Sequence, residues 1–128
     1  MSEDIKLIKK QLHKIYKGGH PDYIDETFDE LELYSKKNAD YAKGGDPFGN
    51  FKRVGAILSL YPNLKPSNPV VVCIIYLLKQ LDCILWMLSM EYDGNVEGKQ
   101  ERFTDIYIYA KIGKLLDNLA SQEKKEKE

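Results

Sequence analysis

The sequence predicts an all-α protein, a single-domain bundle of four to five helices, and three observations support this fold class. Apolar residues recur at three- and four-residue spacing in several segments, which is the period of a helix that buries one face. Asp46-Pro47 and Asn68-Pro69 are typical helix starts, because Asp or Asn caps the first turn and proline suits the first helical position. The chain has 128 residues, 43% of them hydrophobic and 30% charged, which suits one globular domain with a single core.

Two amphipathic helices are predicted in the first third of the chain. The first covers residues 3–17 and ends at Gly18-Gly19. The second begins near Pro21 and ends near Tyr41. The residues expected to face the core are Ile5, Ile8, Leu12 and Ile15 in the first helix and Ile24, Phe28, Leu31 and Tyr34 in the second.

Three further helices follow. A third helix is predicted from Pro47 to about Leu60, with an apolar stripe of Phe51, Val54, Ile57 and Leu58. A central fourth helix runs from Pro69 to Met90. Its β-branched first turns do not make it a strand, because no turn signal interrupts the segment. The last helix covers about Gln100 to Leu119. Residues 122–128 form a charged tail expected to be disordered, which leaves residues 1–121 as the bundle domain.

Composition narrows the class of protein. A formal net charge of −1 argues against a general nucleic-acid binder. Cys73 and Cys83 lie in the most apolar segment and are interpreted as buried free thiols. The lysine-rich, amphipathic start lacks a secretory pattern, so a cytoplasmic location is expected. Lys79, Gln80 and Asp82 interrupt the apolar fourth helix, which favours a buried core helix over a membrane span.

The strongest candidate site is the junction between the second and third helices. Asn38, Asp40 and Tyr41 precede a diglycine turn, and the Asp46-Pro47 helix start follows it. Backbone groups at helix ends lack intrahelical partners, and a helix N-terminus favours an anion. This junction therefore predicts a binding site without naming a reaction.

Two charged groups inside apolar helices are the next candidates. Lys79 and Asp82 share a face of the fourth helix, and either an ion pair, an exposed strip or a pocket wall explains them. In a pocket, Lys79 would face an anion and Asp82 a cation. Asp105 opens an apolar run of the last helix, and metal ligation, a hydrogen bond to Tyr41 or Lys79, and simple exposure all stay open.

The second helix carries an acidic face made of Asp25, Glu26, Asp29, Glu30 and Glu32. Carboxylates one turn apart can hold a divalent cation. A solvated face opposite the apolar stripe is the favoured interpretation.

Four motifs occur in a fixed order: Lys37-Asn38-Ala39-Asp40-Tyr41, Asp46-Pro47-Phe48-Gly49-Asn50-Phe51, an apolar helix with Lys79, and Asp105-Ile106-Tyr107-Ile108-Tyr109-Ala110. The pattern resembles small phage and prophage proteins related to the nucleotide modification associated domain 1 group. It is more loosely similar to the all-α nucleoside triphosphate pyrophosphohydrolases, which bind magnesium through helical carboxylates. The chain departs from the first pattern at Ala42, where a glycine is expected. The resemblance implies a phage-encoded protein that acts on or near nucleotides.

Two functional hypotheses follow. The first is a nucleotide-handling protein with a pocket between the second, fourth and fifth helices, where hydrolysis of a nucleoside triphosphate with Mg²⁺ stays open. The expected ligand contacts are Lys37, Asn38, Asp40, Tyr41, Asp46, Asn50, Phe51, Lys79 and Tyr109, with Asp82 and Asp105 as metal ligands. The second is a non-enzymatic interaction protein, such as a phage inhibitor of a host defence complex, whose acidic face imitates nucleic-acid phosphate. A homodimer is compatible with either, because the fourth helix is so apolar.

Overall fold

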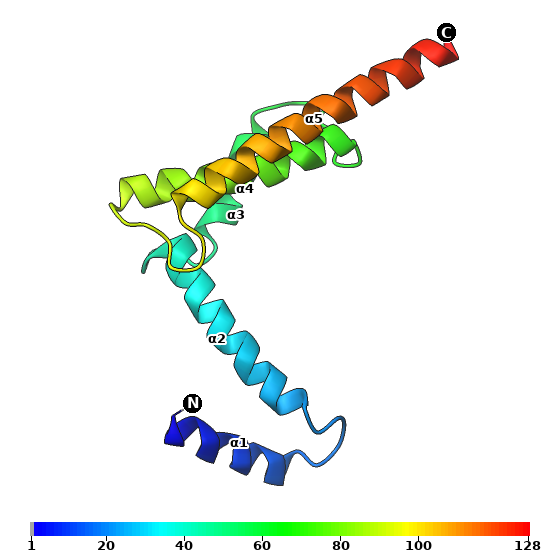
Figure 1. Cartoon of the computed structure of the whole chain (residues 1–128). Helices are drawn as coiled ribbons and strands as arrows, with labels where there is room; N and C mark the ends of the chain where they lie inside the picture. Colours follow the sequence, from blue (N-terminus) through cyan, green and yellow to red (C-terminus); the bar gives the residue numbers. More distant parts are fainter. Residues whose placement is uncertain (1) are drawn as a thin grey trace. The chain divides into compact units, whose positions relative to one another are not determined.

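The computed structural model describes residues 2–128, and this part of the chain contains five α-helices and no strand. The helices are α1 (Glu3–Ile15), α2 (Tyr23–Ala42), α3 (Gly49–Ser59), α4 (Pro69–Ser89) and α5 (Lys99–Lys127) (Figure 1). The predicted all-α class is confirmed.

Contacts divide the chain into two compact units, with the boundary between Lys37 and Asn38. The first unit contains α1 and most of α2. The second contains the last turn of α2 together with α3, α4 and α5. The expectation that residues 1–121 form one bundle stays a prediction.

The first unit is a helical hairpin held by charge and by one cation–π contact. Ser2 caps α1 by accepting a hydrogen bond from the Ile5 amide at 3.3 Å. Across the hairpin, Asp25 Oδ1 lies 3.4 Å from Lys9 Nζ and 3.8 Å from His13 Nε2. Lys9 Nζ also lies 5.4 Å from the centre of the Phe28 ring. The predicted pair of amphipathic helices is present, although α2 begins two residues after Pro21.

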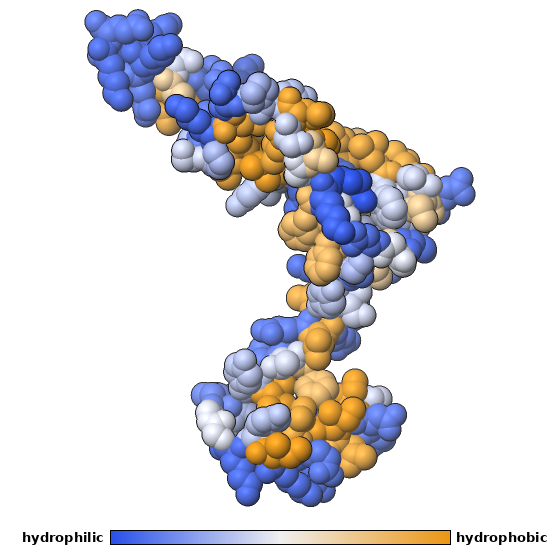
Figure 2. All heavy atoms as spheres, turned by 180° about the vertical axis from the view of Figure 1, so that it is seen from behind, coloured by the Kyte–Doolittle hydropathy of each residue, from blue (hydrophilic) through white to orange (hydrophobic). Residues whose placement is uncertain are grey.

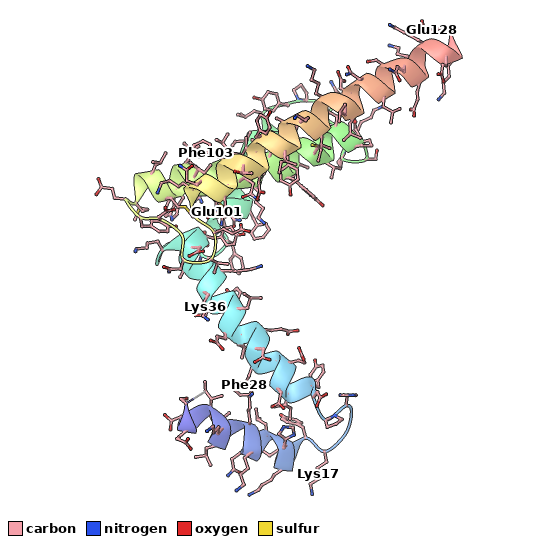
Figure 3. All side chains as sticks on the ribbon, in the orientation of Figure 1. Lys17, Phe28, Lys36, Glu101, Phe103 and Glu128 are labelled. Carbon is pink, nitrogen blue, oxygen red and sulfur yellow. The ribbon has the colours of Figure 1, made fainter. Side chains whose placement is uncertain are left out.

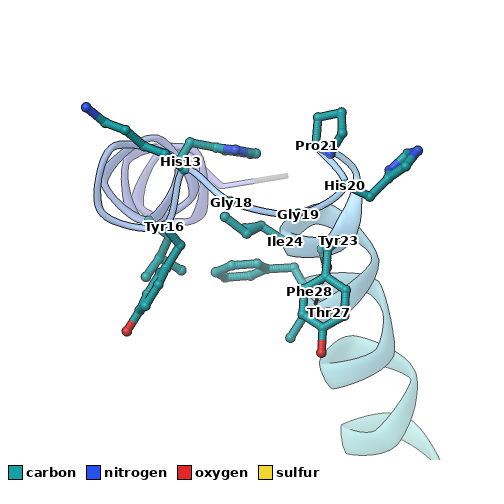
Figure 4. A pocket seen from close by; sticks show the side chains of 12 residues that line it. His13, Tyr16, Gly18, Gly19, His20, Pro21, Tyr23, Ile24, Thr27 and Phe28 are labelled. Carbon is teal, nitrogen blue, oxygen red and sulfur yellow. Dashed lines mark hydrogen bonds between the residues drawn. The ribbon is translucent and has the colours of Figure 1, made fainter.

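A hollow of about 810 Å³ opens between the two helices of this hairpin. Figure 4 shows the aromatic rings of Tyr16, Tyr23 and Phe28 around it, with Ile24 between them. The predicted ligand contacts and metal ligands are not among the residues that line it.

The second unit is organised around α4. Helix α5 packs antiparallel along α4, as shown by the contacts of Cys73 with Tyr109 and of Gln80 with Arg102, and α3 packs on another side. The buried apolar residues are Ala42, Val54, Cys73, Cys83, Ile84 and Met87. Both cysteines are free and buried, as predicted.

Helix α4 confirms the fourth predicted helix despite its β-branched start. Asn68 Oδ1 accepts a hydrogen bond from the Val70 amide at 3.0 Å, and Pro69 occupies the first turn. By length and composition α4 is apolar enough to cross a membrane, and 39% of that apolar window is buried inside the structure. Gln80 and Asp82 are among its buried residues, whereas Lys79 is exposed.

The start of α3 differs from the prediction. Asp46 does not cap a helix that opens at Pro47. Its Oδ1 accepts a hydrogen bond from the Phe48 amide at 2.9 Å, which closes a turn, and the helix begins at Gly49. Of the predicted stripe only Val54 is buried, while Phe51 is 73% exposed. The short helix therefore contacts α4 along a narrow line.

The C-terminal segment also differs. The structure has no disordered tail over residues 122–128. Instead α5 continues to Lys127 and runs past the N-terminal end of α4 (Figures 1 and 3). Glu and Lys are good helix formers, and Lys124, Lys125 and Lys127 lie at the negative end of the helix dipole. Local propensity explains this extension, because these turns are fully exposed.

The buried thiol of Cys83 makes stability depend on alkaline pH. Burial raises the pKa of Cys83 to about 11, against 9.0 for an ordinary thiol. The unfolded chain therefore loses this proton first, so the free energy of unfolding falls as pH rises from 9 to 11, by up to about 3 kcal/mol. Urea unfolding of wild type and Cys83→Ala across this range checks it. Parallel pH profiles for the two proteins would contradict the assignment.

Candidate functional site

The second unit contains a cluster of buried polar side chains where the end of α2 meets α4, α5 and the α4–α5 loop. Burying a polar group is costly unless it is hydrogen-bonded, so the bonds of each residue show what it does. The buried polar residues of the second unit are Asp40, Asn50, Gln80, Asp82 and Arg102. All of them except Asn50 belong to this cluster, together with three neighbours that are less buried, namely Tyr41, Arg53 and Lys79.

Asp40 holds the α4–α5 loop against the end of α2. Its Oδ1 accepts a hydrogen bond from the Asn95 amide at 2.6 Å. Its Oδ2 accepts from the amides of Val96 and Glu97 at 2.7 and 3.3 Å. The Tyr92 hydroxyl donates to the Asp40 carbonyl oxygen. Three backbone amides thus compensate the buried carboxylate, and Asp40 has a clear structural role.

Asp82 is the partner of Arg53, not of Lys79. The guanidinium of Arg53 donates from Nε to Asp82 Oδ1 at 2.7 Å and from Nη2 to Asp82 Oδ2 at 2.9 Å. This hydrogen bonding raises the pKa of Arg53. The guanidinium also stacks 4.5 Å from the Trp86 ring. The predicted metal ligand Asp82 therefore joins α3 to α4 through a bidentate ion pair.

Close packing against Trp86 explains the diglycine turn. Trp86 Nε1 donates to the Ala42 carbonyl oxygen at 3.1 Å, which fixes the end of α2 on α4. A Cβ added at Gly45 would lie 3.0 Å from both that oxygen and Trp86 Cζ2. Gly44 has φ +79°, a conformation that favours glycine. Backbone geometry and lack of space account for both glycines.

Two cations converge on the ring of Tyr41. The Arg102 guanidinium carbon lies 4.9 Å from the ring centre and Lys79 Nζ lies 5.4 Å from it. Arg102 is 1% exposed and donates from Nη1 to Gln80 Oε1 at 2.8 Å. Its nearest carboxylate, Glu97 Oε2, lies 3.7 Å away. The Arg102 Nε has no hydrogen-bond partner among residues 2–128.

The structure brings only some of the predicted site residues together. Asp40, Tyr41 and Lys79 lie in this cluster, and Asn38 is half-buried at the end of α2. Asp105 is half-buried one turn after Arg102 on α5. The Tyr109 ring instead packs edge-to-face on Tyr76, with centroids 5.7 Å apart, and lies seven residues beyond Arg102, about 10 Å along the helix.

The remaining predicted contacts lie elsewhere. Asn50 is buried in the first turn of α3. Asp46 Oδ2 pairs with Lys52 Nζ at 2.6 Å, and Phe51 projects to solvent. Lys37 is exposed and belongs to the first unit. Within residues 2–128 no three His, Cys, Asp or Glu side chains are grouped to hold a metal ion, and the magnesium assignment stays a prediction.

Sequence reasoning missed Arg53 and Arg102, although the sequence held a signal. These are the only two arginines in the chain, among 19 basic residues. Arginine suits buried and bidentate contacts better than lysine does. An arginine used so rarely was therefore a candidate for a specific partner, and both residues lie in the cluster.

Comparisons of the chain with models of protein families, with curated proteins and with solved structures give no match.

The three amide bonds to Asp40 predict a large effect of its removal. In Asp40→Ala the amides of residues 95–97 lose their acceptors, and the free energy of unfolding should fall by about 3 kcal/mol. Asp105→Ala is the matched control, because Asp105 accepts no hydrogen bond from residues 2–128, and it should cost less than about 1 kcal/mol. Urea denaturation measures both variants. Equal destabilisation would show that the amide bonds contribute little.

Proposed function

We propose that the protein binds a nucleotide in the second unit, with phosphate near Lys79 and Arg102 and with Tyr41 between them. The observation that carries the proposal is the pair of cations on the Tyr41 ring, one of which is buried with an unbonded Nε. The residues come from α2, α4 and α5, the three helices that the sequence predicted would form the pocket.

The charges around Arg102 favour an anion. Its amide partner Gln80 carries no charge, and the carboxylate of Glu97 belongs to a side chain that is 47% exposed. An exposed carboxylate at this distance is screened by water and compensates a buried cation only weakly. A phosphate would supply the missing charge, because guanidinium groups bind phosphate through paired hydrogen bonds.

Lys79 supplies the accessible part of this site. Its side chain is exposed and forms no ion pair with any described residue. An incoming phosphate would meet Lys79 first, and rotation of the half-buried Tyr41 ring would open the path to Arg102. The ring then offers a stacking surface for a base.

Asp105 is the carboxylate best suited to hold a magnesium ion carried by the phosphates. It lies one turn from Arg102 and accepts no hydrogen bond from the described residues. Hydrolysis of a nucleoside triphosphate is the extension of this proposal, and the cytoplasm is the proposed compartment.

Calorimetric titration of purified protein with a panel of nucleotides, with and without Mg²⁺, tests binding. Lys79→Gln should weaken binding roughly tenfold or more, because it removes the accessible cation. Lys65→Gln is the control, since Lys65 is an exposed lysine of the α3–α4 connection. Asp105→Asn should reduce only the Mg²⁺-dependent part of the affinity. Absence of binding across the whole panel would overturn the proposal.

A second candidate is the interaction protein, a phage inhibitor of a host protein complex, supported by the acidic face of α2. Asp25 pairs with α1, and Glu32 pairs with Lys36 at 3.2 Å. Asp29 and Glu30 are exposed, and neither forms an ion pair with a described residue. Unpaired carboxylates one residue apart are available to a basic partner protein.

Charge reversal separates this candidate from the nucleotide proposal. The double variant Asp29→Lys with Glu30→Lys should abolish capture of a host protein, because a rim of like charge repels the basic partner. Glu123→Lys in the exposed last turns of α5 is the control. Pull-down from host lysate compares the three proteins, and undiminished capture by the double variant would exclude the acidic face.

A further inference from the structure

One side of α4 carries an exposed apolar stripe with the spacing of a coiled-coil seam. Its residues recur at intervals of four, three, four and three. Four of the five have between 37% and 57% of their surface exposed, and the other is half-buried. The stripe consists of Ile74, Leu78, Leu81, Leu85 and Leu88. An average interval of 3.5 residues keeps such a stripe facing a neighbouring helix over its whole length.

The other sides of α4 already have neighbours. Gln80 faces α5 through its bond to Arg102, and Asp82 faces α3 through its bond to Arg53. At 100° per residue the stripe lies on the remaining side, turned by about 120° from Gln80 and by about 80° from Asp82.

Helix α5 extends this apolar side. Arg102 and the position one turn after it face α4. Phe103 and Tyr107 each come one residue later in the chain. Because α5 runs antiparallel to α4, these two residues fall on the same side as the stripe. Both are more than half exposed. Figure 3 labels Phe103 near the start of α5, and Figure 2 shows apolar side chains exposed along the rods of α4 and α5 up to the charged C-terminal turns.

The stripe is free of charge. Lys79 and Asp82 are the only charged residues of α4, and both are turned toward the sides occupied by Tyr41 and Arg53. With Phe103 and Tyr107 the exposed apolar area is on the order of 600 Å², which reaches the upper limit for a monomer's largest patch and approaches the roughly 800 Å² that each partner buries in a stable complex.

We propose that this side of α4 and α5 is a homodimer interface, in which the stripe packs against the same stripe of a second copy. A second copy brings a helix with the same repeat and no charge, and a two-fold axis pairs the patch with itself. The dimer places two copies of α4 and two of α5 in one four-helix layer. This inference is independent of the proposed nucleotide site.

Sedimentation equilibrium of the full chain without nucleotide tests the interface. Wild type should be dimeric at micromolar concentration. Leu85→Lys, at a position 57% exposed, should raise the dimer dissociation constant about 100-fold, because each dimer loses two buried leucines and gains two like charges. Leu115→Lys is the matched control, at a position of α5 that is 62% exposed and lies outside the stripe, and it should stay dimeric.

Circular dichroism checks that each variant is folded. If Leu85→Lys is unfolded, Leu88→Lys is measured in its place. A monomeric wild type overturns the proposal. A dimer that survives both stripe substitutions would also overturn it, because the interface would then lie elsewhere. A monomer that floats with lipid vesicles would overturn it as well and would assign the stripe to a bilayer.

Discussion

The second unit depends on the pairing of charges that it buries. Asp40, Asp82 and Arg102 lie in its interior, where an uncompensated charge costs several kcal/mol. Each of them therefore holds a neighbouring group in place. Asp40 binds the α4–α5 loop, Asp82 binds the guanidinium of Arg53, and Arg102 binds the side-chain amide of Gln80. The apolar core is small, so these bonds decide how α2, α3 and α5 meet α4.

The same constraint separates the groups of the cluster whose hydrogen-bonding capacity is used within the fold from those with capacity to spare. The carboxylate of Asp40 is bound by backbone amides and that of Asp82 by a guanidinium, so both residues stabilise the packing of the unit. Arg102 has spare hydrogen-bonding capacity, and the neighbouring Lys79 is open to solvent. The excess of donors around the Tyr41 ring is the reason why we propose an anionic ligand for this part of the cluster, because an anion supplies the acceptors that the cluster lacks.

A second imbalance concerns apolar surface. Helix α4 has three sides, and the second unit covers two of them, with α5 on one and α3 on another. The uncovered side keeps the repeat that helices use to pair, and polar residues are confined to the covered sides. A dimer through this side would complete the core and leave the Tyr41 cluster accessible, so that the proposed assembly and the proposed ligand binding would use different sides of one helix.

The sequence by itself determined the helical class, the extent of α4 and the position of the diglycine turn, because apolar period, Asn68-Pro69 capping and glycine conformation are local properties. It also predicted Asp40, Tyr41 and Lys79 as site residues, and the structure places these three residues in one cluster. Only tertiary structure decided their partners. Asp82 pairs with Arg53 across 29 positions and Tyr41 meets Arg102 across 61, contacts that no local pattern encodes. The helical C-terminal turns of α5 were not predicted, although Glu and Lys are good helix formers, because a charged segment without a buried face has the composition of a disordered one.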